Sequence, residues 1–482
     1  MTYDGLRTFL GKSDALGEVR RIDDADWNLE INTLAEAVCE HMADPPLLLF
    51  DKIKGYPEGF RVMALPLASR RRIAALLGLP TDISKMQLIR RASRHMRAAK
   101  PIAPVTVPDG PVMQNRMLGN EVDVLRFPVP LAHEKDGGRY IGTADSLINR
   151  DPETGYINMG TYRIQAHGPN RLGLWMSPGQ QGRAICQRYW DKGEACPVVA
   201  TFGGDPLLFM VSSNKLPWGQ SELDYAGGLL GHGVDVIEGP LTGLPIPAHA
   251  EIAIEGEVPP PSEEAAEEGP FGEWPGYYSG GTKGTGELQP VIRVKAVYYR
   301  NDPILVNMAP QWPGAPNKAI RFDAGLLWDQ LEAAGIPGIE GVFVYHPYMV
   351  VVAIKQAYAG HARQAGAGVI AASATARNGR YVVIVDEDID PSNIQEVLWA
   401  METRVDPASD IQIVEGTWST PLDPRMPPEK RAAKDHTNSR AIFYAVRPYG
   451  WRESFPMVNR AERDTLRRVM DKYRDMFPFP EA

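Results

Sequence analysis

The sequence predicts an α/β protein built from three parts, residues 1–110, 111–315 and 316–482. At 482 residues the chain is too long for one ordinary hydrophobic core, so two or three packed domains are expected. Helical and strand patterns are mixed in the first part, short alternating strands dominate the second, and helices alternate with apolar strands in the third. This order predicts a curved or barrel-like sheet between two α/β regions.

The first part reads as a mixed α/β region. Residues 32–42 have the periodicity of a helix, and the apolar run 47–50 is typical of a short buried strand. Residues 69–77 follow an amphipathic pattern that begins with Ser69, a residue type that caps helix N-termini. The proline-rich stretch 101–111 is expected to connect this region to the next.

The second part predicts a barrel-like or strongly curved sheet. Alternating apolar and polar residues, with frequent glycine and proline, indicate strands at 157–166, 198–202, 252–258 and 291–299. Few long helices interrupt these strands, as expected of a sheet that curls on itself. The acidic, proline-rich run 259–268 separates two of the strands.

The third part predicts a parallel α/β layer. Its strand patterns cover 343–354 and 381–390, the second being a continuous apolar run that ends in acids. Helical patterns alternate with these strands at 361–375 and 394–404. A highly charged final helix is expected at 461–476.

Composition indicates a cytoplasmic globular protein. A net charge of −9 leaves no excess of cations to neutralise phosphates, so no nucleic-acid partner is expected. The first residues lack the apolar core of a signal peptide, and no run of eighteen apolar residues occurs, so no membrane partner is expected either. Only three cysteines occur, Cys39, Cys186 and Cys196, which suits free thiols in a reducing compartment.

Two common motifs in the third part each have a structural alternative. The glycines of 366–371, with Asp386 downstream, fit a loose dinucleotide fingerprint. The polar, helical residues before them instead predict a position inside a helix, where small residues permit close packing. Asp386 and Asp388 follow an apolar strand, where α/β sheets bind ligands, so they could hold the metal of a sugar-nucleotide transferase. The structural alternative, which we favour, is that they cap a helix and form a turn.

Two carboxylates five residues apart, Glu268 and Glu273, flank a rigid turn of glycine, proline and phenylalanine. Glu268 could simply end the solvated acidic run. Glu273 stands in an apolar stretch of sequence that contains Phe271, Trp274, Pro275 and Tyr277. Apolar surroundings raise the pKa of a carboxyl group and make it a proton donor near neutral pH. The local sequence leaves the solvated and the catalytic interpretation open.

Several blocks of sequence, in order and with similar spacing, resemble the UbiD family of prenylated-FMN decarboxylases. The blocks are 53–56 (IKGY), 136–140 (DGGRY), 158–163 (NMGTYR), Ser212-Ser213 with Ser221-Glu222, 268–273 (EGPFGE), and 381–390 (YVVIVDEDID) followed by 397–404 (VLWAMETR). The resemblance covers nearly the whole chain. It implies an N-terminal α/β region, a central flavin-reductase-like split β-barrel and a C-terminal α/β domain. It also implies a homodimer or a hexamer in which the last helix reaches a neighbouring copy, although 461–476 could be an ordinary exposed helix.

The resemblance implies a catalytic trio of Arg163, Glu268 and Glu273. Arg163 would bind the substrate carboxylate, because a permanently charged guanidinium can fork onto both oxygens. Glu273 would return a proton to carbon once CO2 has left, and Glu268 would hold Arg163 in place. The reaction implied is reversible, non-oxidative decarboxylation of an aromatic or unsaturated acid, with prenylated FMN as the electron sink.

The resemblance also implies a set of cofactor-binding and metal-binding residues. The cofactor contacts would be Asn158, Tyr162, Gln180, Gln181, Ser212, Ser213, Glu222 and Arg440. The ions would be a divalent metal, Mn2+ or Mg2+, on Asn158, Gln181 and Glu222, and K+ near Val211, Ser212 and Asn214. Two positions depart from the family pattern. Gln181 stands where a histidine normally binds the metal, which makes Mg2+ more credible, and Arg440 replaces a phosphate-binding lysine.

The substrate class and two rival functions stay open at this point. We expect an aromatic or heteroaromatic acid rather than an acrylic acid. Residues 308–312 could line the mouth of the site, where Trp312 could stack on a flat ring, or they could be a surface loop. A flavin prenyltransferase would supply the cofactor. The rivals are a metal-dependent sugar-nucleotide transferase that uses Asp386 and Asp388, and a flavin-binding carrier without catalysis.

Overall fold

The computed structural model describes residues 5–177, 179–214, 216–279, 287–312, 323–345, 348–376, 379–461 and 463–477. The chain divides into two compact units, one of residues 1–79, 90–320 and 421–427, the other of 80–89, 321–420 and 428–482. Most of the first and second parts predicted from the sequence therefore share one unit, and residues 80–89 belong to the other. The predicted limit at 110/111 stays a prediction, and the limit at 315/316 lies outside the described residues.

A small sheet with flanking helices forms the N-terminal part of the first unit. Its elements are α1 (Gly5–Ala15), β1 (Val19–Asp23), α2 (Glu30–His41), β2 (Leu47–Asp51), β3 (Arg61–Ala64) and α3 (Arg70–Leu76). The predicted strand at 47–50 and the predicted helices at 32–42 and 69–77 are confirmed, and Ser69 caps its helix by accepting a hydrogen bond from the backbone N–H of Arg72.

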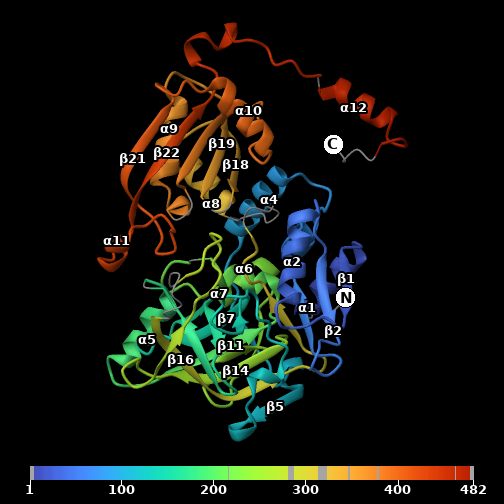
Figure 1. Cartoon of the computed structure of the whole chain (residues 1–482), viewed down its shortest axis with the longest axis vertical. Helices are drawn as coiled ribbons and strands as arrows, with labels where there is room; N and C mark the ends of the chain where they lie inside the picture. The colour runs from blue at the N-terminus through green and yellow to red at the C-terminus, as the bar shows by residue number, and fades with distance from the viewer. Residues whose placement is uncertain are drawn as a thin grey trace. The chain divides into compact units, whose positions relative to one another are not determined.

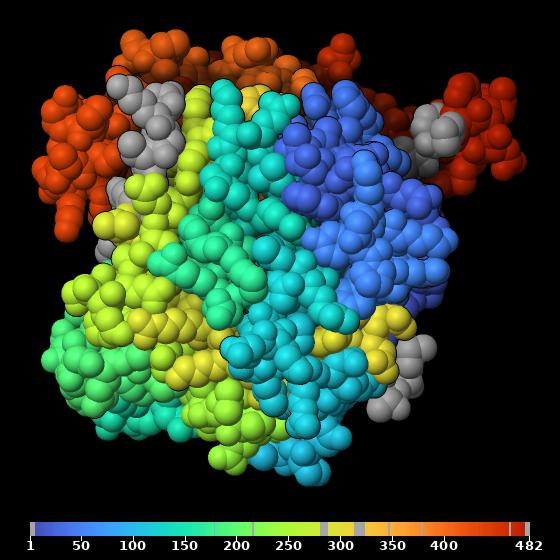
Figure 2. Space-filling model, turned by 60° about the horizontal axis from the view of Figure 1, so that its bottom comes forward, coloured from blue at the N-terminus to red at the C-terminus, as the bar shows by residue number. Residues whose placement is uncertain are grey.

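This sheet depends on a strand from much later in the chain. Its order is β1-β2-β3-β17, and β17 (Ile304–Asn307) pairs in parallel with β3. Figure 2 shows the N-terminal region, in blue, packed directly beside the cyan and green central region. One buried apolar cluster includes side chains from both regions, such as Phe50, Phe127 and Phe202. The N-terminal sheet and the central sheet are therefore built around a shared core.

A curled antiparallel sheet of ten strands forms the central part of the first unit (Figure 1). Its path runs through β6 (Tyr140–Gly142), β9 (Arg163–Ala166), β10 (Arg171–Trp175), β16 (Glu287–Tyr299), β14 (Ile252–Val258), β11 (Cys196–Phe202), β7 (Asp145–Arg150) and β8 (Ile157–Gly160). The thirteen-residue β16 also pairs with β5 (Asn115–Leu118) and β15 (Ala265–Glu268). The predicted curved sheet is confirmed.

Two details of this sheet correct the sequence interpretation. The predicted strand 157–166 is two strands, β8 and β9, separated by Thr161 and Tyr162. The chain turns there because β8 pairs with β7 while β9 pairs with β6 and β10. The acidic run 259–268 is more than a separator, since its last residues form β15 against β16.

Three helices pack against the β7–β8 side of the sheet: α5 (Gln181–Trp190), α6 (Pro206–Ser212) and α7 (Glu222–Leu230). In a further helix, α4 (Lys85–Ala98), the residues up to Ile89 belong to the second unit and those from Arg90 onward to the first. The order β13-β12-β4 describes a small separate sheet of β4 (Val105–Thr106), β12 (Asp235–Glu238) and β13 (Pro245–Pro247). The predicted connector 101–111 thus contains one short strand.

The second unit is a five-stranded sheet in the order β18-β19-β20-β22-β21. The strands are β18 (Ile339–Tyr345), β19 (Met349–Ile354), β20 (Tyr381–Asp386), β22 (Thr437–Ala445) and β21 (Ile411–Trp418). The three central strands are parallel, as predicted, but both edge strands are antiparallel. The predicted strand region 343–354 is therefore a hairpin of β18 and β19.

Helices cover both faces of this second sheet. They include α8 (Asp323–Ala333), α9 (His361–Ala371) and α10 (Ile394–Arg404), and α11 (Pro428–Ala432) and α12 (Arg463–Lys472) follow later in the chain. Val397 and Ala400 of α10 cluster with Val383 and Val385 of β20. In α9, a Cβ atom on Gly366 would lie 2.9 Å from the side chain of Ile442. Residues 442 and 383 point to opposite faces, because β20 and β22 pair Val382 with Ile442 and side chains alternate along a strand.

The glycines of 366–371 lie inside α9, as their packing interpretation predicted. A Cβ atom on Gly368 would lie 2.4 Å from a methyl of Ile336, so these residues must be small for α9 to approach its neighbours. The helix begins at His361 rather than at the glycines, and no strand leads directly into them. The dinucleotide interpretation is therefore wrong.

Asp386 and Asp388 are bound by arginines. Arg404 Nη1 donates to Asp386 Oδ2 at 2.8 Å, and Arg404 Nη2 donates to Asp388 Oδ2 at 2.7 Å. The backbone N–H of Arg447 donates to the same Asp386 oxygen at 2.7 Å. The side chains of Asp386 and Arg404 are each only 1% exposed, so the pair anchors the end of β20 to α10.

Among the described helices, none combines the length and the apolar character needed to cross a bilayer. The three cysteines are buried free thiols.

We expect Arg404→Ala to lower the free energy of unfolding by about 3 kcal/mol, because it removes the buried cation of Asp386 and leaves only the more exposed Arg447, whose Nε lies 3.2 Å from Asp386 Oδ2. Urea unfolding followed by circular dichroism measures the change. The control is Arg460→Ala, which removes an exposed pair with Glu396 and should cost no more than about 0.5 kcal/mol. Equal stability of the two variants would contradict the structural role assigned to Arg404.

Candidate active site

Arg163 and Glu268 form a buried ion pair between two strands of the curled sheet, β9 and β15. Arg163 is the first residue of β9, and Glu268 is the last residue of β15. The guanidinium donates from Nε to Glu268 Oε1 at 2.6 Å and from Nη2 to Oε2 at 2.5 Å. Their side chains are 9% and 1% exposed. This forked geometry fixes the plane of the guanidinium.

Glu273 approaches the same guanidinium from the turn that follows β15. Arg163 Nη1 donates to Glu273 Oε1. Two backbone hydrogen bonds hold the turn, from Glu273 N to Tyr277 O at 3.0 Å and from Gly276 N to Glu273 O at 2.8 Å. The structure thus brings the predicted trio together. The apolar surroundings inferred from sequence hold for Phe271, which is buried, but not for Tyr277, which is 63% exposed.

Burial raises the pKa of the Glu273 carboxyl, and the nearby charge of Glu268 adds to the rise. The positive charge of Arg163 opposes both effects but does not cancel them. Three groups with one positive and two potential negative charges lie in a site of low polarity. Protonation of Glu273 makes the trio neutral, so the geometry favours a carboxylic acid at this position.

Aromatic rings surround the trio, and of these the sequence interpretation used only Phe271, as part of the apolar surroundings of Glu273. The guanidinium carbon of Arg163 lies 4.8 Å from the ring centre of Phe271 and 5.0 Å from that of Trp175. Tyr140 donates from its hydroxyl to Glu268 Oε1 at 3.0 Å. Tyr140 and Phe271 stand in two of the blocks that resemble the UbiD family, which was the available signal. The rings exclude water from the ion pair and strengthen its electrostatics.

The three predicted ligands of a divalent metal surround β8. Asn158 lies on β8 and is buried, while Gln181 and Glu222 are the first residues of α5 and α7, the two helices that pack on this strand. Glu222 accepts a hydrogen bond from the backbone N–H of Met159 at 2.9 Å. Burial raises the pKa of the Glu222 carboxyl to about 7. A nearby cation would favour its charged form.

Gln181 differs from the other two ligands because its amide is already hydrogen-bonded at both ends. Its Oε1 accepts from the Tyr156 hydroxyl at 3.0 Å, and its Nε2 donates to Leu216 O at 2.8 Å. Within the described ranges, no three His, Cys, Asp or Glu side chains gather as a metal site. A metal here would therefore depend on one carboxylate, on amide oxygens and on whatever the ligand supplies.

The residues predicted near the potassium ion lie at the C-terminal end of α6. The Ser212 hydroxyl lies 2.8 Å from Thr161 Oγ1 and 3.1 Å from Ser146 Oγ. Val211 O accepts from the backbone N–H of Asn214 at 3.0 Å. Ser213 lies in the same turn and donates from its hydroxyl to Met210 O at 2.9 Å. These hydroxyls and carbonyls offer oxygen ligands directly beside the corner between β8 and β9.

Tyr162 and Gln180 occupy structural positions at the same corner. The Tyr162 hydroxyl accepts from the backbone N–H of Gly182 at 3.1 Å. A Cβ atom on Gly182 would lie 2.4 Å from that oxygen, so the buried ring requires glycine there. Gln180 precedes α5 and gives it no side-chain cap. A contact of either residue with a cofactor stays a prediction.

Sequence reasoning missed a buried carboxyl at this corner. Asp145 is 1% exposed, and its Oδ1 has no hydrogen-bond partner among the described residues. Burial raises the pKa of Asp145 to about 8. Its backbone carbonyl accepts from Thr161 Oγ1 at 3.0 Å, which places it next to the Ser212 cluster. The sequence offered little signal, because Asp145 starts a strand, DSLINR, that also contains other polar residues.

Arg440 belongs to the second unit, on β22. Its Nη2 donates to Ala376 O at 2.8 Å and to Trp418 O at 3.0 Å, while its buried Nη1 has no hydrogen-bond partner in the described part of the chain. An arginine with a spare buried donor suits an anion. Its place beside the residues of the first unit stays a prediction.

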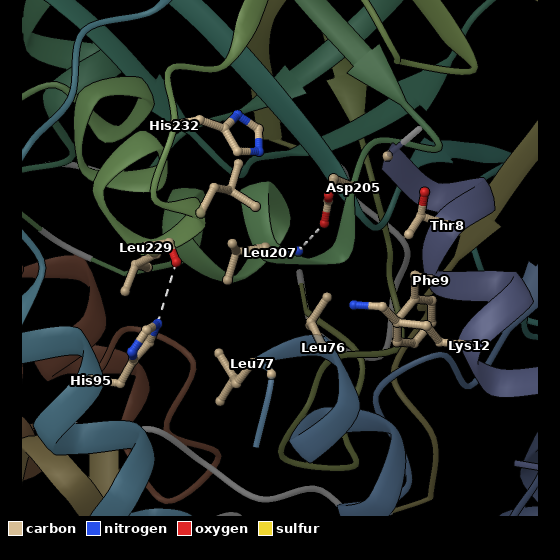
Figure 3. Close-up of a pocket in the computed structure, with 13 residues that line it drawn as sticks. Thr8, Phe9, Lys12, Leu76, Leu77, His95, Asp205, Leu207, Leu229 and His232 are labelled. Carbon is tan, nitrogen blue, oxygen red and sulfur yellow. Dashed lines mark hydrogen bonds between the residues drawn. The ribbon is translucent and has the colours of Figure 1, made fainter. Parts of the chain in front are cut away.

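A cavity of about 300 Å³ lies at the N-terminal end of α6 and the C-terminal end of α7. Ser212 and Glu222 stand at the other ends of these two helices. Figure 3 shows Lys12, His95 and His232 on its walls, with several leucines between them. The Asp205 carboxylate caps α6 there by accepting from the backbone N–H of Leu207 at 2.7 Å. Its lining includes none of the predicted site residues, so the cavity lies outside the candidate active site.

Comparison with known proteins connects this geometry to a family. The chain matches three domains of 3-octaprenyl-4-hydroxybenzoate carboxy-lyase: the N-terminal domain at residues 10–92, the Rift-related domain at 104–313 and the C-terminal domain at 323–445. It is 31% identical to a phenolic acid decarboxylase of Streptomyces sp. (strain D7), over 90% of this chain and 91% of that protein. It is 32% identical to the pyrrole-2-carboxylic acid decarboxylase of Pseudomonas aeruginosa, over 80% of each.

Solved structures show the same arrangement along nearly the full length. The UbiD-class enzyme HmfF from Pelotomaculum thermopropionicum, in complex with FMN, superposes with a TM-score of 0.83 at 27% identity, over 96% of this chain and 98% of that one. An evolved dimeric form of HmfF in complex with prFMN gives 0.79 at 25% identity, with the same coverage. The three domains match in order, two relatives exceed 30% identity, and the fold is shared. The chain therefore belongs to the UbiD family of carboxy-lyases.

Proposed function

We propose that this protein uses prenylated FMN to remove CO2, reversibly, from an aromatic or heteroaromatic carboxylic acid. The observation that carries the proposal is the buried trio, in which one guanidinium is shared by a fixed carboxylate, Glu268, and a second carboxyl, Glu273, whose pKa is raised by burial. Decarboxylation needs an anchor for an anionic substrate and a proton for the product. The trio offers one group for each task.

The residues around β8 suit the phosphate of a flavin and the ions that would bind it. Glu222 is a buried carboxylate with a raised pKa, and Asn158 and the Ser212 cluster add neutral oxygens. Mn2+ or Mg2+ on the first two and K+ at the end of α6 would supply the positive charge that a phosphate requires. When bound, prenylated FMN supplies an acceptor for the electron pair that CO2 leaves behind.

Arg163 would hold the substrate carboxylate with the donors that the glutamates leave free. A guanidinium has five N–H groups, and the three hydrogen bonds to Glu268 and Glu273 leave two. Because Glu268 takes the Nε edge, the free donors lie on the two terminal nitrogens. Glu273, in its acid form, would then deliver a proton to the carbon that lost CO2 and recover one from solvent.

The substrate class rests on the relatives. A phenolic acid and pyrrole-2-carboxylic acid are both flat rings that carry one carboxylate, and we infer a ring of this kind here. Trp312 is 51% exposed and available to stack on such a ring. An α,β-unsaturated acrylic acid is the alternative. Turnover of a panel of ring acids and cinnamic-type acids separates the two classes.

Two rivals from other classes fare differently. The transferase interpretation is wrong, since the chain belongs to a family of carboxy-lyases and arginines bind Asp386 and Asp388. The carrier interpretation predicts flavin binding without chemistry. Protein co-expressed with a flavin prenyltransferase, which we propose as the cofactor source in a reducing cytoplasm, should show a modified-flavin spectrum and release CO2. The spectrum without turnover of any acid would favour the carrier.

We expect Glu273→Gln to lower the rate of decarboxylation by at least about 100-fold, because the amide cannot supply the proton. Flavin retention should be unchanged. The matched control is Glu267→Gln, an exposed neighbour on β15, which should keep the parental rate. Near-parental turnover by Glu273→Gln would remove Glu273 from the mechanism.

We expect apo-protein to bind Mn2+ weakly, because Gln181 offers an amide oxygen that already accepts from Tyr156. Gln181→His should tighten Mn2+ binding, and Glu222→Ala should abolish cofactor retention, since it removes the carboxylate of the site. Calorimetric titration of Mn2+ and flavin assay after gel filtration measure these effects. Tight binding of Mn2+ by the apo-protein, or full flavin retention by Glu222→Ala, would place the metal elsewhere.

We also propose a homodimer or a hexamer that uses α12. Leu466 and Val469 of α12 and Tyr473, which directly follows the helix, are spaced three and four residues apart and are each 38–40% exposed, so they form an apolar stripe along one side of this segment. We expect a chain truncated after Arg460 to have a lower mass by light scattering than the full chain. Arg468→Ala, off the stripe, is the control. An unchanged mass after truncation would exclude α12 from the interface.

A further inference from the structure

His133 connects the turn that carries Glu273 to two other segments of the first unit. Its ring Nδ1 lies 3.2 Å from Asp136 Oδ2, and its Nε2 lies 3.1 Å from Pro310 O. The same Nε2 lies 3.3 Å from Nδ2 of Asn32, a buried residue of α2. One ring therefore meets its own loop, α2 and the segment 308–312 that is expected to line the mouth of the site.

The chemistry of these partners depends on the protonation of the ring. Asp136 and the carbonyl of Pro310 can only accept hydrogen bonds, so satisfying both requires a proton on each ring nitrogen. The Asn32 amide nitrogen can only donate, and its Oδ1 already accepts from Gln311 Nε2 at 3.0 Å. A neutral ring would thus accept from Asn32 at Nε2 and release Pro310. The two states differ in which segment the ring binds.

The surroundings favour the cation. Burial acts to lower the pKa of His133, but the hydrogen bond to Asp136 and the charges of Asp136 and Glu36 outweigh it, and the net effect is a raised pKa. Asp136 belongs to the same loop, Glu36 to α2, and Tyr278, packed edge-on at 6.3 Å, to the turn after Glu273. The segment 308–312 contributes no titratable side chain. These facing groups are acidic or neutral.

The connection to Glu273 runs through one peptide group. Asp136 Oδ1 accepts from the backbone N–H of Gly272 at 2.8 Å, directly before Glu273. A Cβ atom on Gly272 would lie 2.7 Å from His133 Nδ1, so the ring rests on that backbone. The Asp136 side chain has no exposed surface. Movement of the His133–Asp136 pair would therefore move the carboxyl of Glu273.

We propose that His133 is a positioning residue that works as an imidazolium, and that its protonation ties the segment 308–312 to the turn that aims Glu273. This inference rests on the proposed function for its catalytic consequence, but the state of the ring is a property of the protein alone. Because folding raises the pKa of His133, the bond to Pro310 is fully present at low pH and is lost as the pH rises through the folded-state pKa.

The first experiment measures the ring itself. The full chain is labelled with 13C at histidine Cε1 and studied by NMR. Of the signals of the nine histidines, that of His133 is assigned as the one that disappears in His133→Gln. We expect it to titrate above the ordinary histidine pKa. Asp136→Asn should move the pKa below the ordinary value, since burial then dominates, and Glu36→Gln should give a smaller drop without disturbing the loop. A His133 pKa at or below the ordinary value, or one insensitive to both variants, would overturn the proposal.

The second experiment measures the consequence for catalysis. Parental kcat should fall as the pH rises through the His133 pKa found by the titration. His133→Gln should lack that step: it should be about tenfold slower than the parental protein below that pKa, and the difference should narrow above it. His95→Gln, which removes another half-buried ring whose Nε2 lies 3.3 Å from a carbonyl, is the control and should keep the parental profile. A step that persists in His133→Gln contradicts the positioning role. If no acid is turned over, the proposed function fails, and the titration alone still decides the state of the ring.

Discussion

A buried guanidinium has to be neutralised, and in this protein two carboxyl groups compete to do so. Leaving Arg163 without a partner would cost several kcal/mol, so Glu268, which forks onto it, stabilises the fold as well as the site. Once that pair is made, the charge of Arg163 is largely balanced. The second carboxyl, Glu273, then meets a desolvated environment with little positive charge to spare, and the proton on it becomes favourable. The acid of the site is a consequence of the ion pair beside it.

The curled sheet is what brings these groups together. Arg163 and Glu268 are separated by 105 residues in sequence, yet three strand pairings connect them: β9 with β10, β10 with β16, and β16 with β15. Because β16 is long enough to pair with strands on both sides along its length, it carries β15 over the end of β9. A flat sheet in the same order would hold them apart. The strand curvature therefore sets the distance on which the proposed chemistry depends.

The break between β8 and β9 separates the residues of the trio from the predicted metal ligands. On one side of Thr161 and Tyr162 the chain carries Arg163 towards the trio, and on the other it carries Asn158 towards Glu222. Both side chains are held by the register of adjacent strands rather than by loops, which gives rigid placement. The cost of such rigidity is local: glycine is required at Gly182, and at Gly272 the ring of His133 leaves no space for a side chain.

The sequence by itself determined the mixture of helices and strands and the curled central sheet, and its family resemblance named the three residues, Arg163, Glu268 and Glu273, that the structure brings together. Hydrophobic periodicity is a local property, so β14 and α10 could be predicted with their limits, and the order of six short blocks identified the family. Only the tertiary structure decided that Gln181 has its oxygen occupied by Tyr156, that Tyr277 faces solvent and that His133 meets Pro310. These facts depend on long-range pairing and on the orientation of amides and rings. No local pattern of residues encodes them. The partners of Gln181 and His133 come from more than twenty residues away in the sequence, and the direction of the Tyr277 side chain is set only by the packed turn.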